Sequence, residues 1–210
     1  MFYINQRDYP DVKYLTRTDV PEDEYGHKST VFTSACGLCC AMMVLSRLLP
    51  RDDYEFTLED ALQLSYDTHA NHGYGTDGKI FFPAFAEKFG LRYAPTNDIG
   101  AVKECLRTGG AVIVLVGQRD EEGHIAVFTH KEHYICLTAV LADGRFEVLD
   151  PYLYDGKFEE PGREGKVELS GHIVRCPEEV ILDDALLVIR RSEGFPDTEK
   201  TKAFHLFWRG

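Results

Sequence analysis

The sequence has no long apolar run, no excess of positive charge and no internal repeat. None of its apolar stretches approaches the roughly 18 residues of a membrane helix, so we expect no membrane span. The 35 acidic against 23 basic residues leave a net charge of −12, which argues against nucleic acid or an anionic membrane as partner. With no low-complexity linker, the 210 residues predict one domain; the oligomeric state stays open.

Cysteine is also scarce, because six in the whole chain are too few for a disulfide scaffold. Cys36, Cys39 and Cys40 fall within one helical turn, where they cannot easily pair with each other. We therefore expect free thiols in a reducing compartment. Residues 1–6 lack the basic and apolar regions of a signal peptide. We expect a cytoplasmic protein, with secretion possible only if a leader has already been removed.

The hydrophobic pattern predicts helices early in the chain and strands later. The predicted helices are 36–49, 58–67, 79–89 and 99–108, the second opened by a capping box at Thr57 and Asp60. The predicted strands are 91–94, 111–116, 133–141, 145–149 and 185–190. Residues 19–24 and 152–180 are expected to be solvated loops, and the aromatic tail 204–208 to be packed. This order predicts an α+β fold, a helical half on a mostly antiparallel sheet half, with a cleft between them.

Residues 33–49 carry the clearest signal for the start of a helix. Small and polar residues lead into helix formers, and Pro50 ends the run. Cys36 thus lies at the helix N-terminus, where unpaired N–H groups and the macrodipole favour the reactive thiolate. Gly37 is expected to leave room for a substrate backbone. Cys36 is a candidate nucleophile, and an inert buried thiol is the alternative.

A catalytic thiol needs a base, and the base needs a group that orients it. His133 opens a predicted strand, and Asp150 closes the next one after the Asp143–Gly144 turn. The two positions are offset about that turn, so the pattern predicts only that His133 and Asp150 are neighbours. The alternatives are a packed histidine at a strand end and an Asp-Pro turn.

Other histidines and cysteines have weaker contexts. His124 and His130 rival His133 as the base, but each lies in a less regular segment. Cys39 and Cys40 suit core packing. The spacing of Cys36 and Cys39 has no second pair downstream for structural zinc. His69 and His72 lack a carboxylate at ligand spacing, so we expect no metal and no cofactor.

The ordered segments 35–37, 133–135 and 148–151 resemble those of C39-like peptidases, a branch of the papain-like cysteine peptidases. The segment 3–6 is similar to the N-terminal segment of that family. The resemblance covers residues 3–151 and implies a papain-like fold. It implies Cys36 as nucleophile, His133 as general base and acid, Asp150 as the group that orients His133, and Gln6 as an oxyanion-hole donor.

The chain departs from the family pattern at two positions, and residues 152–210 match no segment of the family. Leu38 stands where members usually have proline, and Glu132 where they have glycine. A carboxylate at 132 is expected to raise the pKa of His133 and to crowd the groove. The activity implied is hydrolysis of a peptide or related amide. The alternatives are a catalytically inactive peptide-binding relative and an acyltransferase or transglutaminase-like enzyme.

Overall fold

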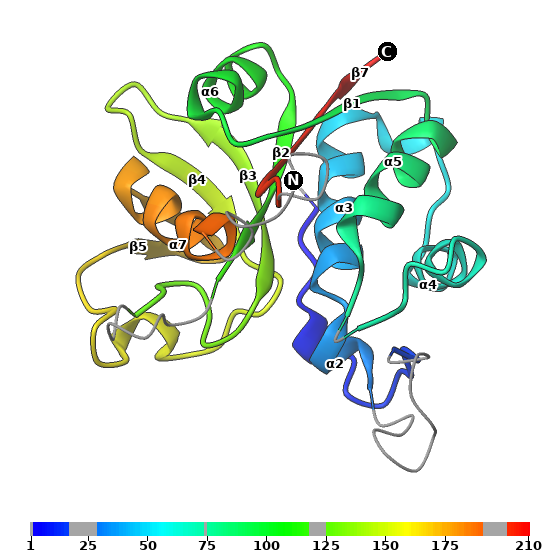
Figure 1. The fold of residues 1–210 in the computed structure, drawn as a ribbon, viewed down its shortest axis with the longest axis horizontal. Helices are drawn as coiled ribbons and strands as arrows, with labels where there is room; N and C mark the ends of the chain where they lie inside the picture. Colours follow the sequence, from blue (N-terminus) through cyan, green and yellow to red (C-terminus); the bar gives the residue numbers. More distant parts are fainter. Residues whose placement is uncertain (1, 17–28, 74, 118–124, 191–200) are drawn as a thin grey trace.

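Figure 1 shows a computed structural model of the chain, in which helices lie beside one face of a sheet and further helices lie beside the other. The residues that it describes are 2–16, 29–73, 75–117, 125–190 and 201–210. The predicted loop at 19–24 and His124 lie outside them.

The first part of the chain is helical, as predicted. Its helices are η1 (Gln6–Asp8), α2 (Val31–Ser34), α3 (Cys36–Leu48), η2 (Arg51–Asp53), α4 (Leu58–Asp67) and α5 (Gly78–Lys88). The capping box of α4 is present: Thr57 accepts a hydrogen bond from the Asp60 N–H at 3.2 Å, and Asp60 accepts one from the Thr57 N–H at 2.8 Å. These bonds satisfy donors that have no partner inside the helix, which fixes where α4 begins.

The described residues form one seven-stranded sheet in which every pairing is antiparallel. Its spatial order is β1-β7-β2-β3-β4-β6-β5. The strands are β1 (Leu91–Thr96), β2 (Ala111–Val116), β3 (His133–Val140), β4 (Phe146–Leu149), β5 (Glu168–Ser170), β6 (Ile173–Cys176) and β7 (Phe204–Arg209), with α6 (Ile99–Arg107) between β1 and β2. The mixture of helices and antiparallel sheet agrees with the predicted α+β class.

Two predictions for the later chain are wrong. Residues 185–190 belong to a helix, α7 (Glu178–Arg190), because Ile181, Ala185 and Val188 are all buried at helical spacing. The short apolar run alone suggested a strand. Residues 152–180 are not one irregular excursion, since they contain η3 (Lys157–Glu159) and the β5–β6 hairpin that extends the sheet.

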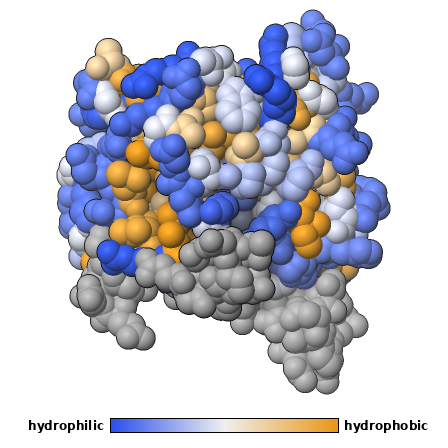
Figure 2. Space-filling model, turned by 45° about the horizontal axis from the view of Figure 1, so that its top comes forward, coloured by the Kyte–Doolittle hydropathy of each residue, from blue (hydrophilic) through white to orange (hydrophobic). Residues whose placement is uncertain are grey.

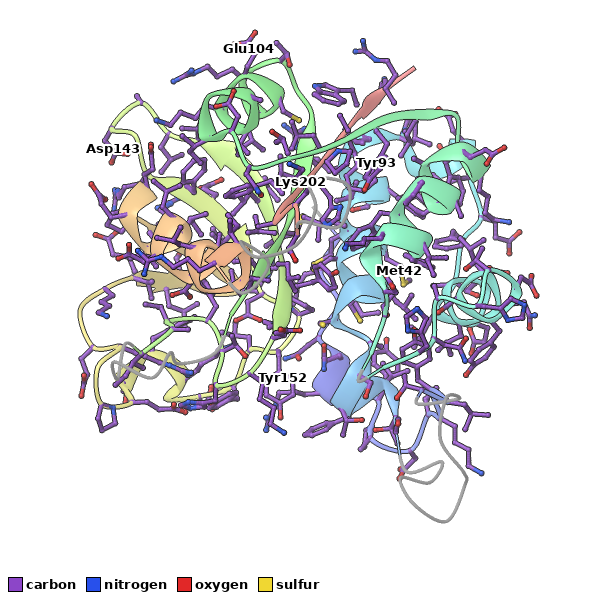
Figure 3. The ribbon with its side chains drawn as sticks, in the orientation of Figure 1. Met42, Tyr93, Glu104, Asp143, Tyr152 and Lys202 are labelled. Carbon is purple, nitrogen blue, oxygen red and sulfur yellow. The ribbon has the colours of Figure 1, made fainter. Side chains whose placement is uncertain are left out.

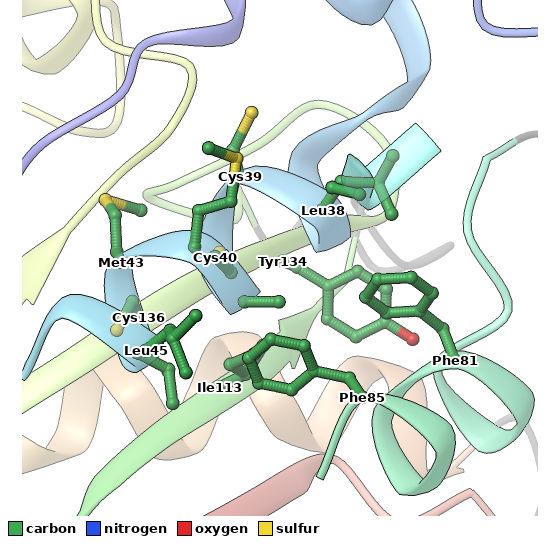
Figure 4. Close-up of a cluster of buried hydrophobic side chains, with 14 of the residues drawn as sticks. Leu38, Cys39, Cys40, Met43, Leu45, Phe81, Phe85, Ile113, Tyr134 and Cys136 are labelled. Carbon is green, nitrogen blue, oxygen red and sulfur yellow. The ribbon is translucent and has the colours of Figure 1, made fainter. Parts of the chain in front are cut away.

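Side chains alternate between the two faces of the sheet and form a core on each. On β2, Ile113 packs with the helices α3 to α5, whereas Val112 and Val114 pack on the side of α6 and α7. Figure 4 shows Met43, Leu45 and Cys40 of α3 grouped with Ile113 and Cys136 of the sheet. The central strands are thus buried on both faces, which fixes α3 against β2 and β3.

The face of the molecule in Figure 2 is largely hydrophilic. Figure 2 shows hydrophilic residues over much of one face, with hydrophobic residues in separate groups between them. Among the described residues, the large hydrophobic side chains that are exposed are Ile80 and Leu169. In the part of the chain that the structure describes, none of the helices is long and apolar enough to cross a membrane.

Candidate functional site

Cys36 is the first residue of α3 and lines a pocket of about 730 Å³. The pocket draws its walls from both halves of the molecule, with Gln6 and Ser34 on the helical side and Leu115 and His133 on the sheet side. In Figure 3, Tyr152 and Lys202, which also line it, lie well apart along the boundary between the halves. Cys36 keeps partial exposure there, as a group that reacts with a bound molecule requires.

The thiol of Cys36 interacts with the imidazole of His133. Burial acts to raise the pKa of Cys36, but the hydrogen bond and the charge of His133 outweigh it and lower that pKa. The backbone N–H groups of Tyr134 and Gly37 act in the same direction. The site therefore favours the thiolate, the nucleophilic form of cysteine.

His133 is held from behind by Asp150. The Nε2 atom of His133 lies 2.8 Å from Oδ1 of Asp150, and both side chains are buried. This bond leaves Nδ1 as the ring nitrogen available to Cys36. Burial acts to lower the pKa of His133, but Asp150 and Cys36 together raise it above its ordinary value. The pair of shifts favours a thiolate beside an imidazolium.

The strand register explains why His133 and Asp150 meet. Cys136 pairs with Leu149, and a β-bulge shifts the register between Leu137 and Ala139. Continuing that register places Asp150 across from residue 135, two positions from His133 and on the same face of the sheet. His133 and Asp150 are therefore neighbours, as predicted, and the register shift at the bulge brings them to the same face of the sheet.

Gln6 lies in the same pocket, on η1. Its side chain is buried, and Nε2 donates to the carbonyl of Phe32 at 2.6 Å. Its backbone N–H donates to the carbonyl of Pro151 at 2.8 Å, next to Asp150. An amide group has two N–H donors, so one remains beside the bond to Phe32. Gln6, Cys36 and His133 thus line one pocket, and Asp150 lies behind His133.

The expected roles of Gly37 and Glu132 differ in the structure. A Cβ atom at position 37 would lie 3.1 Å from Cβ of Thr76 and 3.3 Å from Cδ2 of Tyr134. Gly37 therefore allows close packing of α3 against these residues and leaves no substrate space. Glu132 is exposed and lines the pocket, and the largest causes that raise the pKa of His133 are Asp150 and Cys36.

The remaining candidates have other environments. Cys39 and Cys40 are fully buried, and burial raises the pKa of both thiols. His130 is exposed at the pocket rim and pairs with Glu160 at 2.6 Å. His72 pairs with Asp77 at 3.0 Å. Within the described ranges there is no group of three or more His, Cys, Asp or Glu residues that could hold a metal ion.

Sequence reasoning missed two buried cations beside this site. Lys157 lies 2.5 Å from Oδ2 of Asp150, and the guanidinium of Arg163 donates to the carbonyl of Ala126 at 3.1 Å. Both side chains are at most 2% exposed and line the pocket. They lie in the charged, glycine-rich segment that predicted a surface loop, and no local signal there indicates that a lysine or arginine is buried.

Comparison with solved structures finds similarity at the level of the fold. No protein-family model matches the sequence, and no curated protein matches it. The crystal structure of a proposed C39-like peptidase from Bacillus anthracis is similar over 83% of this chain and 88% of that chain, with a TM-score of 0.50 and 11% sequence identity. At this identity the likeness concerns the fold alone.

Proposed function

We propose that the protein is a C39-like cysteine peptidase, with a papain-like arrangement, that cleaves a peptide or related amide bond. The observation that carries this proposal is that Cys36 and His133 line one pocket, His133 lowers the pKa of the Cys36 thiol, and Asp150 bonds His133 from behind at 2.8 Å. The similarity to a proposed C39-like peptidase supports a fold suited to this chemistry. The paired thiol and imidazole favour an active enzyme over an inactive peptide-binding relative.

In the first step the thiolate of Cys36 attacks the carbonyl carbon of the scissile bond. The carbon–oxygen π electrons move to the oxygen and form a tetrahedral oxyanion. The backbone N–H of Cys36 and the free N–H of Gln6 donate to that oxygen. One such donor typically contributes about 3 kcal/mol to lowering the barrier.

In the second step the carbon–nitrogen bond breaks, and His133 donates its Nδ1 proton to the departing amine. The acyl group stays on Cys36 as a thioester. A water molecule then attacks the thioester carbonyl while His133 accepts one of its protons. The carboxylic acid leaves, and the thiolate and imidazolium of Cys36 and His133 are restored. Asp150 keeps its hydrogen bond to Nε2 and orients the ring throughout.

The decisive test is the reactivity of Cys36 together with cleavage of peptides. Iodoacetamide at pH 6–7 followed by peptide mapping should label Cys36 faster than a free model thiol, because its thiolate form is favoured. Incubation with a peptide library should produce new termini, detected by mass spectrometry. The variant Cys36→Ala should lose both signals, and Cys105→Ala, a buried thiol in the other core, serves as the matched control.

Two outcomes would contradict the proposal. One is labelling of Cys36 at the rate of a free thiol. The other is peptide cleavage that survives Cys36→Ala. Adding hydroxylamine or a primary amine to the cleavage reaction measures how the acyl group divides between water and amine. Products formed only with the amine would indicate an acyltransferase in place of a hydrolase.

A further inference from the structure

Lys157 is a buried lysine directly behind the Cys36 site. Its side chain is 2% exposed, and it follows Gly156, whose φ of 79° turns the chain back on itself. The ammonium donates to Oδ2 of Asp150 at 2.5 Å and to the carbonyl of Tyr152 at 3.0 Å. The carboxylate of Asp150 thus lies between two nitrogen groups, His133 on one oxygen and Lys157 on the other.

The surroundings keep the ammonium in place. The rings of Tyr152, Tyr154 and Phe158 have their centres 5.8 Å from Nζ, at cation–π distance. Arg163 donates to the backbone carbonyl of Lys157 at 3.4 Å. The short helix η3 is therefore fixed on both sides, and Lys157 cannot turn to solvent without breaking these contacts.

The positive charge of Lys157 and the negative charge of Asp150 offset each other inside the protein. Burial lowers the pKa of Lys157, and the carboxylate of Asp150 opposes that effect. Arg163 acts in the same direction as burial, and Glu160 acts with Asp150. A buried charge requires a close partner, and for Lys157 that partner is Asp150. When His133 is protonated, one carboxylate faces two cations.

A buried carboxylate with no second cation would hold the imidazolium of His133 tightly. A tightly held imidazolium is a weak acid, yet the proposed reaction requires it to give its proton to the leaving amine. A positive charge on the far oxygen of Asp150 reduces this hold. The geometry of the hydrogen bond to Nε2 remains, while the net charge behind the ring falls towards zero.

On the premise that Cys36 and His133 carry out acyl transfer, we infer that Lys157 is a positioning residue of the site. Its ammonium fixes the carboxylate of Asp150 and offsets the charge of that carboxylate. Asp150 then orients His133 much as a neutral amide would. The titratable groups that face His133 are Cys36 and Asp150, with the ring of Tyr152 packed edge-on at 6.3 Å between ring centres. Lys157 bonds Asp150, so its effect on His133 passes through that carboxylate.

The test compares Lys157→Met, Asp150→Asn and the double variant that carries both. Met is close to Lys in shape and removes the charge alone. In Asp150→Asn, an amide N–H group faces the ammonium of Lys157. Both groups are hydrogen-bond donors, so they cannot bond to each other. In the double variant that conflict is removed, because the thioether faces the amide as a weak acceptor. Lys166→Met is the matched control, an exposed lysine of the same segment.

The first readout is the pH dependence of Cys36 alkylation by iodoacetamide, which needs no substrate. Its upper step reports loss of the imidazolium proton of His133. Lys157→Met should raise the pKa of this step by about one unit, the lower end of the effect of a nearby charge. NMR titration of labelled His133 checks the assignment, and thermal unfolding shows that each variant is folded. Lys166→Met should leave the step where it is.

The second readout is peptide hydrolysis near pH 7. Lys157→Met should lower kcat by roughly tenfold with KM little changed, because a proton held one unit more tightly is transferred less readily. Asp150→Asn should lower kcat further than Lys157→Met does. The double variant should have a kcat at least about tenfold higher than that of Asp150→Asn, because the effects of substitutions at interacting residues do not add.

The inference is overturned if folded Lys157→Met keeps the wild-type upper pKa, or if the double variant is no better than Asp150→Asn. It is overturned as well if the wild-type alkylation profile has no upper step. If the wild type cleaves no peptide but the upper step shifts as expected, the proposed hydrolysis fails and the role of Lys157 stands.

Discussion

Asp150 and Asp184 are both fully buried carboxylates, yet the partners described for them differ. Asp150 bonds two titratable side chains, His133 and Lys157, and also accepts from the backbone N–H of Tyr152. Asp184, on α7, accepts from the backbone N–H groups of Val127 and Phe128 at 2.9–3.1 Å. A carboxylate held by backbone amides fixes a loop, whereas one held by a histidine and a lysine couples the charges of a site. The comparison indicates which of two equally buried acids bears on chemistry.

The largest expected effect is a difference in catalytic activity between variants of Asp150 and of Asp184. Asp150→Ala should lower kcat/KM for peptide cleavage by about 10²–10⁴, the usual contribution of a positioned acid–base pair. Asp184→Ala should lower kcat far less, because the bonds that this carboxylate accepts from Val127 and Phe128 hold backbone amides and not the imidazole of His133. Steady-state kinetics on both variants measures the difference. Equal losses of kcat would abolish the distinction drawn from their partners.

The next largest effect is on the unfolding free energy, which should depend on Asp184. Asp184→Ala leaves two buried N–H donors on residues 127 and 128 without an acceptor, and should cost roughly 2–4 kcal/mol of unfolding free energy. Denaturant titration followed by fluorescence gives the value. The loop 125–130 that carries Thr129 and His130 to the pocket should also exchange its amide hydrogens faster. An unfolding free energy equal to that of the wild type would contradict a structural role.

A third effect follows from pH. Burial acts to raise the pKa of Asp150, but Lys157 and His133 outweigh it and hold this pKa well below its ordinary value. A depressed folded-state pKa contributes stability that is complete above the unfolded pKa and is lost as pH falls through the folded one. Wild-type unfolding free energy should therefore fall more steeply between about pH 5 and pH 2 than that of the Asp150→Asn, Lys157→Met double variant. Parallel curves would refute the coupling.

The smallest effect concerns the backbone of Asp150. The hydroxyl of Tyr3 donates to the carbonyl of Asp150 at 2.8 Å. Tyr3→Phe removes this bond and should cost about 1 kcal/mol of stability, as for a single hydrogen bond. It should leave the pH profile of alkylation unchanged, because the side chain of Asp150 keeps both partners. A shifted profile would show that the backbone bond also sets the charge coupling.

Local signals were sufficient for the residues that open and close elements. Cys36 at the start of a helix, His133 at the start of a strand and Asp150 after the next strand were all predicted from neighbouring residues. Their alignment was not, because the bulge between Leu137 and Ala139 has no sequence signature. The papain-like arrangement and the catalytic roles of these residues stay predictions, which the experiments above address.

Two errors of prediction have a common physical cause. The apolar run 185–190 is short enough to suit a strand or a helix, and only burial at Ile181 and Asp184 places it in α7. Lys157 is buried because the chain turns back after Asp150 and places that carboxylate and the rings of Tyr152 and Tyr154 around the ammonium. Packing in the folded chain decides both cases, and composition or periodicity alone does not report it.

The placement of β7 between β1 and β2 has a consequence for how the protein is made. Tyr93 and His205 bond at 2.8 Å although 112 positions separate them in the chain. While a ribosome is still synthesising residues 204–209, β1 has no strand to pair with and one edge of β2 is open. Such an edge invites pairing with other chains, and contacts this distant in sequence form slowly. The nascent protein should therefore depend on chaperones until β7 has emerged.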